Sequence, residues 1–243
     1  MKLLAFNSSP RKNKGATDIV LDKFLQGVKD AGGDCEKIYL SDKKINKCQG
    51  CFGCWTKTPG KCVFQNDDMP EILQKIEKVD IVVFATPLYH FNMSSEMKIM
   101  IERTLPLLEP FLLKDKELTK HPRRNKNKKE KWVILSVCGF PEIQHFQALD
   151  LCFEQNARAH EAEIIGKIYR PSSEALKTGA PGFKSYLENC YLAGKEVVKN
   201  GKIKEKTQKN LYKDFVMPKF LFRFVANKFW KKQIKEYRNS PNF

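Results

Sequence analysis

No stretch of this 243-residue chain stays apolar over the ~20 residues that a membrane-spanning helix requires. The segment Met1–Asn7 turns polar too early to provide the apolar core of a secretory signal peptide. These absences favour a cytoplasmic protein over a membrane-spanning or secreted one. In that compartment, clustered cysteines indicate metal or redox chemistry more often than disulfides.

Two nucleotide-binding signatures are also missing. Neither G-x-x-x-x-G-K-[ST] nor G-x-G-x-x-G occurs in the chain. The first absence disfavours a nucleoside-triphosphate loop, and the second removes the dinucleotide fingerprint.

Acidic side chains are in the minority, with 28 Asp and Glu against 44 Lys and Arg and a net charge of +16. The excess lies in two segments, 114–131 with nine basic and three acidic residues, and 201–243 with twelve and three. Because the rest of the chain is close to neutral, we do not expect a fold built around nucleic acid.

Cysteine, by contrast, is concentrated in one place. Four of the eight cysteines fit the pattern C-x2-C-x2-C-x7-C inside the loop 45–66: Cys48, Cys51, Cys54 and Cys62. Two-residue gaps let consecutive thiolates turn toward one centre, and the glycines between them relax the backbone. Four thiolates held this closely suit a [4Fe–4S] cluster or a tetrahedral zinc ion. The remaining alternative is a loop whose thiols stay free or form disulfides.

Apolar runs alternate with amphipathic segments along the rest of the chain. Strands are predicted at 2–7, 34–40, 79–85, 132–138 and 162–169. Helices are predicted from Thr17 to about Gly32, and at 69–78, 94–108, 143–160 and 183–199. This alternation predicts an α/β three-layer sandwich with a five-stranded parallel sheet in the flavodoxin-like order 2-1-3-4-5. We expect that domain to span 1–200, with a helical C-terminal extension over 201–243.

The first predicted strand leads through the polar loop Asn7–Thr17 straight into a helix. Loop amides and the positive end of a helix bind phosphate in many α/β proteins. Ser9 and Thr17 can donate hydroxyl hydrogen bonds, and Arg11 can add a charge-assisted pair. The alternative is an ordinary solvated connection with a helix cap.

A second candidate loop, Thr86–Met93, follows the most apolar strand, and Gly139 and Phe140 follow the next one. Open α/β sheets bind ligands at the carboxyl ends of such strands. Tyr89 and Phe91 offer aromatic planes, and main-chain amides from Leu88 to Asn92 could bond the edge of a flat heterocycle. The alternative is a turn whose aromatic rings only pack.

The two basic segments have weaker interpretations. The insertion 114–131 lacks interleaved aromatics, so we expect a solvated, mobile surface loop. The tail is predicted to be helical from Pro218 and is rich in aromatics. We expect it to pack on its own sheet or on a partner subunit, with contact to a membrane surface as the less favoured reading.

The segments Ser8–Arg11 with Thr17, Cys48–Cys62 and Thr86–Asn92, in that order, resemble the NADPH-dependent FMN reductase-like branch of flavodoxin-like proteins. With its four cysteines the chain is similar to the iron–sulfur flavoprotein family over about residues 1–200, while the insertion and the tail depart from it. The resemblance implies Cys48, Cys51, Cys54 and Cys62 as cluster ligands. It also implies FMN held by Ser9, Pro10, Arg11, Asn13, Ala16, Thr17, Pro87, Leu88, Tyr89, Asn92, Met93, Gly139 and Phe140.

The first functional hypothesis is an FMN-dependent oxidoreductase that moves electrons between a [4Fe–4S] cluster and flavin. It needs no catalytic side chain, because the cofactors carry the chemistry. We expect a small-molecule or protein electron donor and acceptor, with NAD(P)H as one candidate donor, and a homodimer or homotetramer. The cysteine loop is expected at the same carboxyl edge, as one wall of the flavin site. The alternatives are an NAD(P)H-dependent FMN or quinone reductase without iron, and a zinc-stabilised basic binding module.

Overall fold

The computed structural model describes residues 1–178, 181–213 and 217–238. Its central feature is one parallel sheet of five strands in the order β2-β1-β3-β6-β7. The strands are β1 (Lys2–Asn7), β2 (Asp34–Tyr39), β3 (Ile81–Pro87), β6 (Lys131–Val137) and β7 (Glu163–Arg170). The predicted order of five parallel strands is therefore confirmed.

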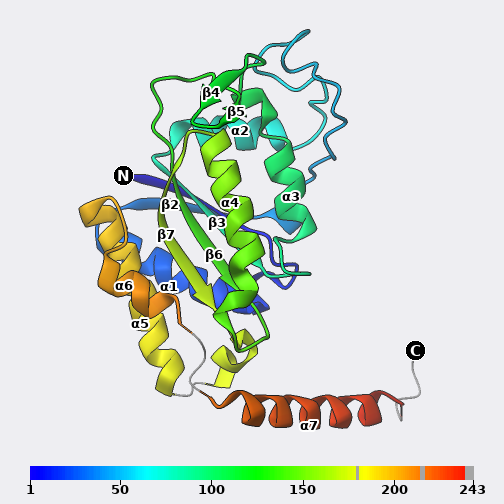
Figure 1. Cartoon of the computed structure of the whole chain (residues 1–243), viewed down its shortest axis with the longest axis vertical. Coiled ribbons are helices and arrows are strands. Elements are labelled where there is room, and N and C mark those ends of the chain that lie inside the picture. The colour runs from blue at the N-terminus through cyan, green and yellow to red at the C-terminus, as the bar shows by residue number, and fades with distance from the viewer. Residues whose placement is uncertain (179–180, 214–216, 239–243) are drawn as a thin grey trace.

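Helices cover both faces of the sheet (Figure 1). One face carries α1 (Ala16–Asp30) and α5 (Pro181–Asn200), and the other carries α2 (Met69–Lys78), α3 (Ser95–Glu102) and α4 (Gln147–Ala159). Side chains alternate between these layers, as the two-residue period of a strand requires. In β1, Leu3 and Ala5 join the core under α1 and α5, whereas Leu4 and Phe6 join the core on the other side.

Two glycines let α1 and α5 pack closely. A Cβ atom on Gly27 would overlap the carbonyl oxygen of Tyr191, and one on Gly194 would overlap that of Phe24. The two backbones therefore lie against each other, and a side chain at either position would have to move one helix.

Several predicted elements have different bounds in the structure. The helix predicted at 143–160 begins as a 3-10 turn at Ile143–Phe146 and continues as α4. The strand predicted at 79–85 is β3 and lies two residues later. The helix predicted at 94–108 ends as α3 at Glu102, and a separate 3-10 turn covers Leu105–Leu107. Pro106 lies within that turn, and proline cannot continue an α-helical hydrogen-bond ladder.

The insertion at 114–131 is exposed over much of its length, as predicted, but it contains a hairpin and a buried ion pair that were not predicted. Its first part forms the hairpin β4 (Leu113–Asp115) and β5 (Leu118–Lys120). Arg123 is buried and pairs with Glu130 and, at 2.6 Å, with Glu77. The chain N-terminal to the insertion supplies Glu77, and that partner could not be deduced from the insertion itself.

The buried guanidinium of Arg123 also affects a neighbouring histidine. The His160 ring is buried against Trp132, and its Nε2 lies 3.1 Å from the hydroxyl oxygen of Thr104. Burial, with a smaller contribution from the charge of Arg123, lowers the pKa of His160 to about 4. This histidine is therefore a neutral core residue at physiological pH.

The C-terminal extension has two different parts. The helix α6 (Glu205–Leu211) packs on β7 and α5, because Gln208 pairs with both backbone groups of Lys167 (2.9 and 2.6 Å) and Thr207 donates to Glu196 (2.9 Å). The helix α7 (Lys219–Arg238) has no buried residue and extends away from the sheet (Figure 1). The expectation that the aromatic tail packs on its own sheet is therefore wrong for α7, and the alternative, packing on a partner subunit, stays a prediction. None of the described helices has the length and apolar character needed to cross a bilayer.

Candidate functional site

Three loops meet at the carboxyl edge of the sheet because they follow the neighbouring strands β1, β3 and β6. The Ser8 amide donates to the carbonyl of Ala85 (2.9 Å), and the Ser94 hydroxyl donates to the carbonyl of Ser8 (3.2 Å). The Leu88 amide donates to the carbonyl of Val137 (2.9 Å). Hydrogen bonds therefore hold the three loops in one arrangement.

The loop after β1 has a buried polar base. Asn7 donates to Asp18 (2.8 Å) and accepts a hydrogen bond from the Ser9 amide (2.9 Å), while Lys37 donates to Asp18 (2.9 Å). Burial opposes the charge of Lys37, but hydrogen bonds to Asp22, Tyr39 and Asp18 outweigh it and raise its pKa. Sequence reasoning did not identify Asn7, Asp18 and Lys37, whose contacts depend on the packing of β2 beside β1.

The same loop presents free donors at the start of α1. Ala16 and Thr17 open the helix, so their amides have no intrahelical acceptor, and neither donates to another group in the described part of the chain. The side chains of Ser9 and Thr17 are buried beside them. A Cβ atom on Gly15 would lie 2.7 Å from the Ser9 hydroxyl oxygen, so glycine keeps this turn tight. Amides, hydroxyls and the helix dipole together suit an anion.

Two of the three cations of this loop have carboxylate partners at the surface. Arg11 pairs with Glu174 at 2.9 Å, and Lys12 pairs with Asp42. Pro10 and Asn13 are exposed. A role for Arg11 at a phosphate therefore stays a prediction, and it would require the guanidinium to leave or share Glu174.

The loop after β3 contains a tight turn. Tyr89 and Asn92 exchange backbone hydrogen bonds of 2.9 and 3.0 Å, while His90 and Phe91 adopt left-handed backbone angles with φ of 45° and 63°. The expectation that main-chain amides from Leu88 to Asn92 could bond a flat heterocycle is therefore limited to part of this turn. Leu88, Tyr89 and Asn92 are used within the protein, and in the described chain only the amides of His90 and Phe91 remain available in this turn.

Aromatic side chains connect the second and third loops. The His145 ring lies 4.6 Å from the Phe140 ring and 5.7 Å from the Phe91 ring, and its Nε2 lies 3.2 Å from Glu142. About half of Tyr89, Phe91 and Phe140 is exposed, so these rings present apolar surface to solvent at the edge. Sequence reasoning missed His145. The sequence did offer a signal: His145 follows Glu142 by three residues, a spacing at which the two side chains can pair, shortly after the end of a predicted strand.

The cysteine loop is closed at both ends by one arginine. Arg103 donates to the carbonyl of Asn46 (2.7 Å), to the carbonyl of Phe64 (3.0 Å) and to both carboxylate oxygens of Asp67 (2.7 and 3.3 Å). Asn46 and Phe64 each lie two residues outside the cysteine motif. Burial lowers the pKa of Arg103, but the hydrogen bonds and charges of Asp67 and Cys62 outweigh it and raise that pKa.

All four predicted cysteine ligands line one small pocket of about 20 Å³ together with Arg103. Burial raises the pKa of the Cys54 thiol, and the neighbouring thiols Cys62, Cys48 and Cys51 raise it further. A single zinc ion requires its thiolates about 2.3 Å from one point. In the described part of the chain, no three His, Cys, Asp or Glu side chains form such a group. A four-iron cluster would take one thiolate at each iron, so the four thiols match its ligand number, as they match that of a structural zinc ion.

The cysteine loop does not form a wall of the three-loop edge, contrary to expectation. It packs beyond the C-terminal end of α3, where the Trp55 indole donates to the carbonyl of Leu105 (3.3 Å) and its ring centre lies 4.6 Å from that of His121. The other end of α3 adjoins Met93, and an eight-residue helix is about 12 Å long. In Figure 1 this light-blue segment lies near β4 and β5, away from the carboxyl ends of β6 and β7.

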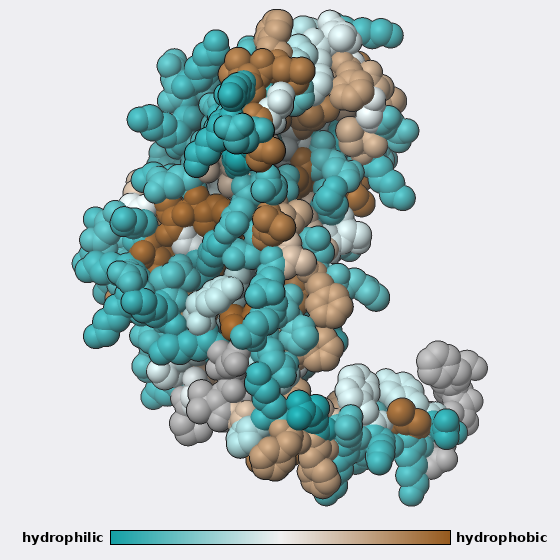
Figure 2. Space-filling model, in the orientation of Figure 1, coloured by the Kyte–Doolittle hydropathy of each residue, from teal (hydrophilic) through white to brown (hydrophobic). Residues whose placement is uncertain are grey.

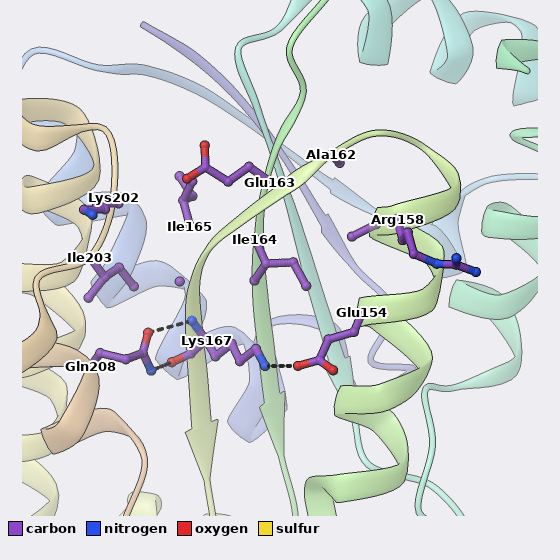
Figure 3. A pocket seen from close by; sticks show the side chains of 12 residues that line it. Glu154, Arg158, Ala162, Glu163, Ile164, Ile165, Lys167, Lys202, Ile203 and Gln208 are labelled. Atoms are coloured by element: carbon purple, nitrogen blue, oxygen red, sulfur yellow. Dashed lines mark hydrogen bonds and ion pairs between the residues drawn. The ribbon is translucent and has the colours of Figure 1, made fainter. Parts of the chain in front are cut away.

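A larger groove of about 650 Å³ lies beside β7 (Figure 3). Three of its polar residues are paired with one another, since Lys167 binds Glu154 at 2.8 Å and Gln208 pairs with the backbone of Lys167. It follows the first half of β7 and lies outside the three-loop edge. Size alone therefore does not mark the functional site.

The model of the NADPH-dependent FMN reductase family matches residues 1–122. An iron-sulfur flavoprotein of Archaeoglobus fulgidus is 42% identical over 44% of this chain and 46% of its own length. Iron-sulfur flavoprotein MJ1083 of Methanocaldococcus jannaschii is 34% identical over 48% and 58%. A putative NAD(P)H-dependent FMN-containing oxidoreductase of Bacillus subtilis, YwqN, is 27% identical over 70% and 87%. The chain thus spans about half the length of the iron-sulfur flavoproteins that it matches.

Solved structures agree on the fold. The NAD(P)H:quinone oxidoreductase from Methanothermobacter marburgensis has a TM-score of 0.60 and 15% identity, covering 84% of this chain and 98% of that one. A flavone reductase has a TM-score of 0.57 and 17% identity, covering 82% and 64%. At these identities the likeness concerns the fold alone.

Proposed function

The chain belongs to the NADPH-dependent FMN reductase family, and from this membership we propose that it is an FMN-dependent oxidoreductase carrying a [4Fe–4S] cluster. The observation that carries the proposal is the three-loop edge, with a helix N-terminus on one side and exposed aromatic rings on the other. When bound, the two cofactors supply the electron-transfer chemistry. The side chains of this protein bind, orient and shield them.

Each loop has a separate task in this proposal. The amides of Ala16 and Thr17 and the hydroxyls of Ser9 and Thr17 would hold the flavin phosphate. The exposed rings of Tyr89, Phe91 and Phe140 would exclude water from the faces of the isoalloxazine. The remaining predicted contacts, Pro10, Arg11, Asn13, Pro87, Leu88, Asn92, Met93 and Gly139, belong to the same loops and stay predictions.

The cysteine loop would hold the cluster through Cys48, Cys51, Cys54 and Cys62. Arg103 supports this role because its guanidinium joins both ends of the loop and lies beside Cys62. A positive charge next to a thiolate ligand stabilises the anionic form. The zinc-stabilised binding module is disfavoured, since membership of the NADPH-dependent FMN reductase family speaks against it.

Flavin, iron and sulfide analysis of anaerobically purified protein tests the proposal. We expect FMN together with iron and sulfide in the wild type. Cys54→Ser should lose iron and sulfide but keep FMN. Thr17→Val should keep iron but weaken FMN binding about tenfold, because one charge-assisted hydrogen bond is worth roughly 1.5 kcal/mol. Cys152→Ser, outside the motif, is the matched control and should keep both. Protein that takes up no FMN would contradict the proposal.

A second candidate is an NAD(P)H-dependent FMN or quinone reductase without iron. The small volume of the cysteine pocket favours it, as does the similarity to the Bacillus subtilis oxidoreductase over most of this chain. Stoichiometric FMN with neither iron nor sulfide, even after anaerobic purification, would select this candidate.

A further inference from the structure

The C-terminal helix α7 carries large apolar side chains that are exposed to solvent. The exposed ones are Phe220, Leu221, Phe224, Val225, Phe229, Trp230, Ile234 and Tyr237. A single helix gains little stability from propensity alone and normally depends on burying one face. Apolar surface on this scale marks an interaction site.

The last three turns of α7 separate apolar from basic residues. Trp230, Ile234 and Tyr237 recur at intervals of four and three residues and therefore share a face, and Phe229 packs edge-on against Trp230 with ring centres 5.4 Å apart. The opposite face carries Lys228, Lys231, Lys232, Lys235 and Arg238. Figure 2 shows aromatic rings and hydrophilic side chains next to each other along this projecting helix.

Charge narrows the choice of partner. The helix has seven Lys and Arg against one acidic residue, Glu236. A second copy of α7 would bring like charges together. A nucleic acid would match the charge but would leave the aliphatic Leu221, Val225 and Ile234 without apolar contacts. An anionic bilayer offers phosphate groups for the cations and an acyl boundary for the apolar face.

We propose that α7 anchors the protein to the surface of an anionic phospholipid bilayer. The helix lies in the headgroup region, with Phe229, Trp230 and Ile234 inserted and the lysine face toward the lipid phosphates and water. It lies on the bilayer and does not cross it, because it is too highly charged to span. The proposal does not rest on the electron-transfer function. It adds a cellular location, the membrane surface, at which the enzyme would act.

Co-sedimentation of the full-length protein with vesicles tests the anchor. We expect binding to phosphatidylcholine–phosphatidylglycerol vesicles to be at least about tenfold tighter than to phosphatidylcholine alone, and to weaken as salt screens the lysines. Trp230 emission should shift to the blue with vesicles, and Trp230→Phe should remove that shift. Equal binding to both vesicle types, or no binding, overturns the proposal.

Two triple variants separate the contributions, and a third is the control. Lys231→Glu/Lys232→Glu/Lys235→Glu should lose the preference for anionic lipid, and Phe229→Ser/Trp230→Ser/Ile234→Ser should weaken binding by about tenfold or more. Lys114→Glu/Lys126→Glu/Lys129→Glu has the same charge change on exposed residues of the insertion and should bind like the wild type. Because α7 buries no residue, all three should keep the wild-type melting temperature, which confirms folding.

Three results would overturn the proposal, and each would indicate a different explanation for the exposed helix. Equal loss in the insertion control would indicate attraction by net charge alone. Tight binding to duplex DNA that the serine variant leaves unchanged would indicate nucleic acid. Dissociation of an oligomer by the α7 variants in sedimentation velocity, with no vesicle binding by the wild type, would indicate a second copy of the chain.

Discussion

At the scale of single residues, Arg103 is the side chain on which the cysteine loop depends most. Its guanidinium is 3% exposed, and the carboxylate of its partner Asp67 is fully buried. The Asp67 carboxylate also accepts hydrogen bonds from the backbone amides of Asn46 (2.9 Å) and Met69 (3.1 Å). One ion pair therefore joins the beginning of the loop, its end and the start of α2.

Replacing Arg103 should be costly for this reason. Arg103→Gln leaves the buried carboxylate of Asp67 without its cation, and we expect a loss of about 3–5 kcal/mol in the free energy of unfolding. Lys98→Gln on α3 is the control, because its pair with Glu102 is exposed and should contribute only about 0.3–0.5 kcal/mol. Urea denaturation measures both. Similar values for the two variants would show that Arg103 does not hold the loop.

At the scale of secondary-structure elements, the contact between α1 and α5 fixes one layer of the fold. Gly194 has no room for a side chain because the Phe24 carbonyl occupies that position, so Gly194→Ala should destabilise by about 1–3 kcal/mol through overpacking. Gly182, near the start of the same helix, faces open space. Gly182→Ala should stabilise by about 0.5–1 kcal/mol. In urea denaturation, the free energy of unfolding should therefore fall for Gly194→Ala and rise for Gly182→Ala. A change of the same sign in both variants would contradict the close packing of α1 and α5.

The elements also show what a sequence can predict. Strands β1, β3 and β6 were identifiable because central parallel strands are buried on both faces and form continuous apolar runs. Because the loops after parallel strands lie at the same edge of a sheet, the same reasoning predicted that Ser9, Thr17 and Tyr89 lie at one edge. The position of the cysteine loop was not predictable, because it depends on Arg103 and His121, whose contacts with the loop cross 39 to 66 residues of sequence. The burial of Arg123 was missed for the same reason, because its partner Glu77 lies on α2.

At the scale of the whole molecule, the boundary expected at residue 200 can be tested by truncation. Ile203 and Leu211 are buried in the main core, whereas α7 contributes no buried residue. Deleting residues 217–243 should therefore leave the melting temperature within about 2 °C of the wild type. Deleting 201–243 should cost about 3–6 kcal/mol, since each buried aliphatic side chain contributes roughly 1.5–3 kcal/mol. If both deletions have the same effect on thermal unfolding, α6 does not belong to the core domain.

The pairing of Gln208 with Lys167 has a consequence for self-association. β7 is an outer strand of the sheet, and such strands normally offer unpaired amides and carbonyls to any extended peptide. Here the Gln208 side chain occupies both backbone groups of Lys167, and the Ile203 amide occupies the carbonyl of Ile165 (3.0 Å). A foreign strand would have to displace both before it could continue the ladder. The segment from Ile203 through α6 thus covers this edge of the sheet and hinders amyloid-like stacking and β-strand addition.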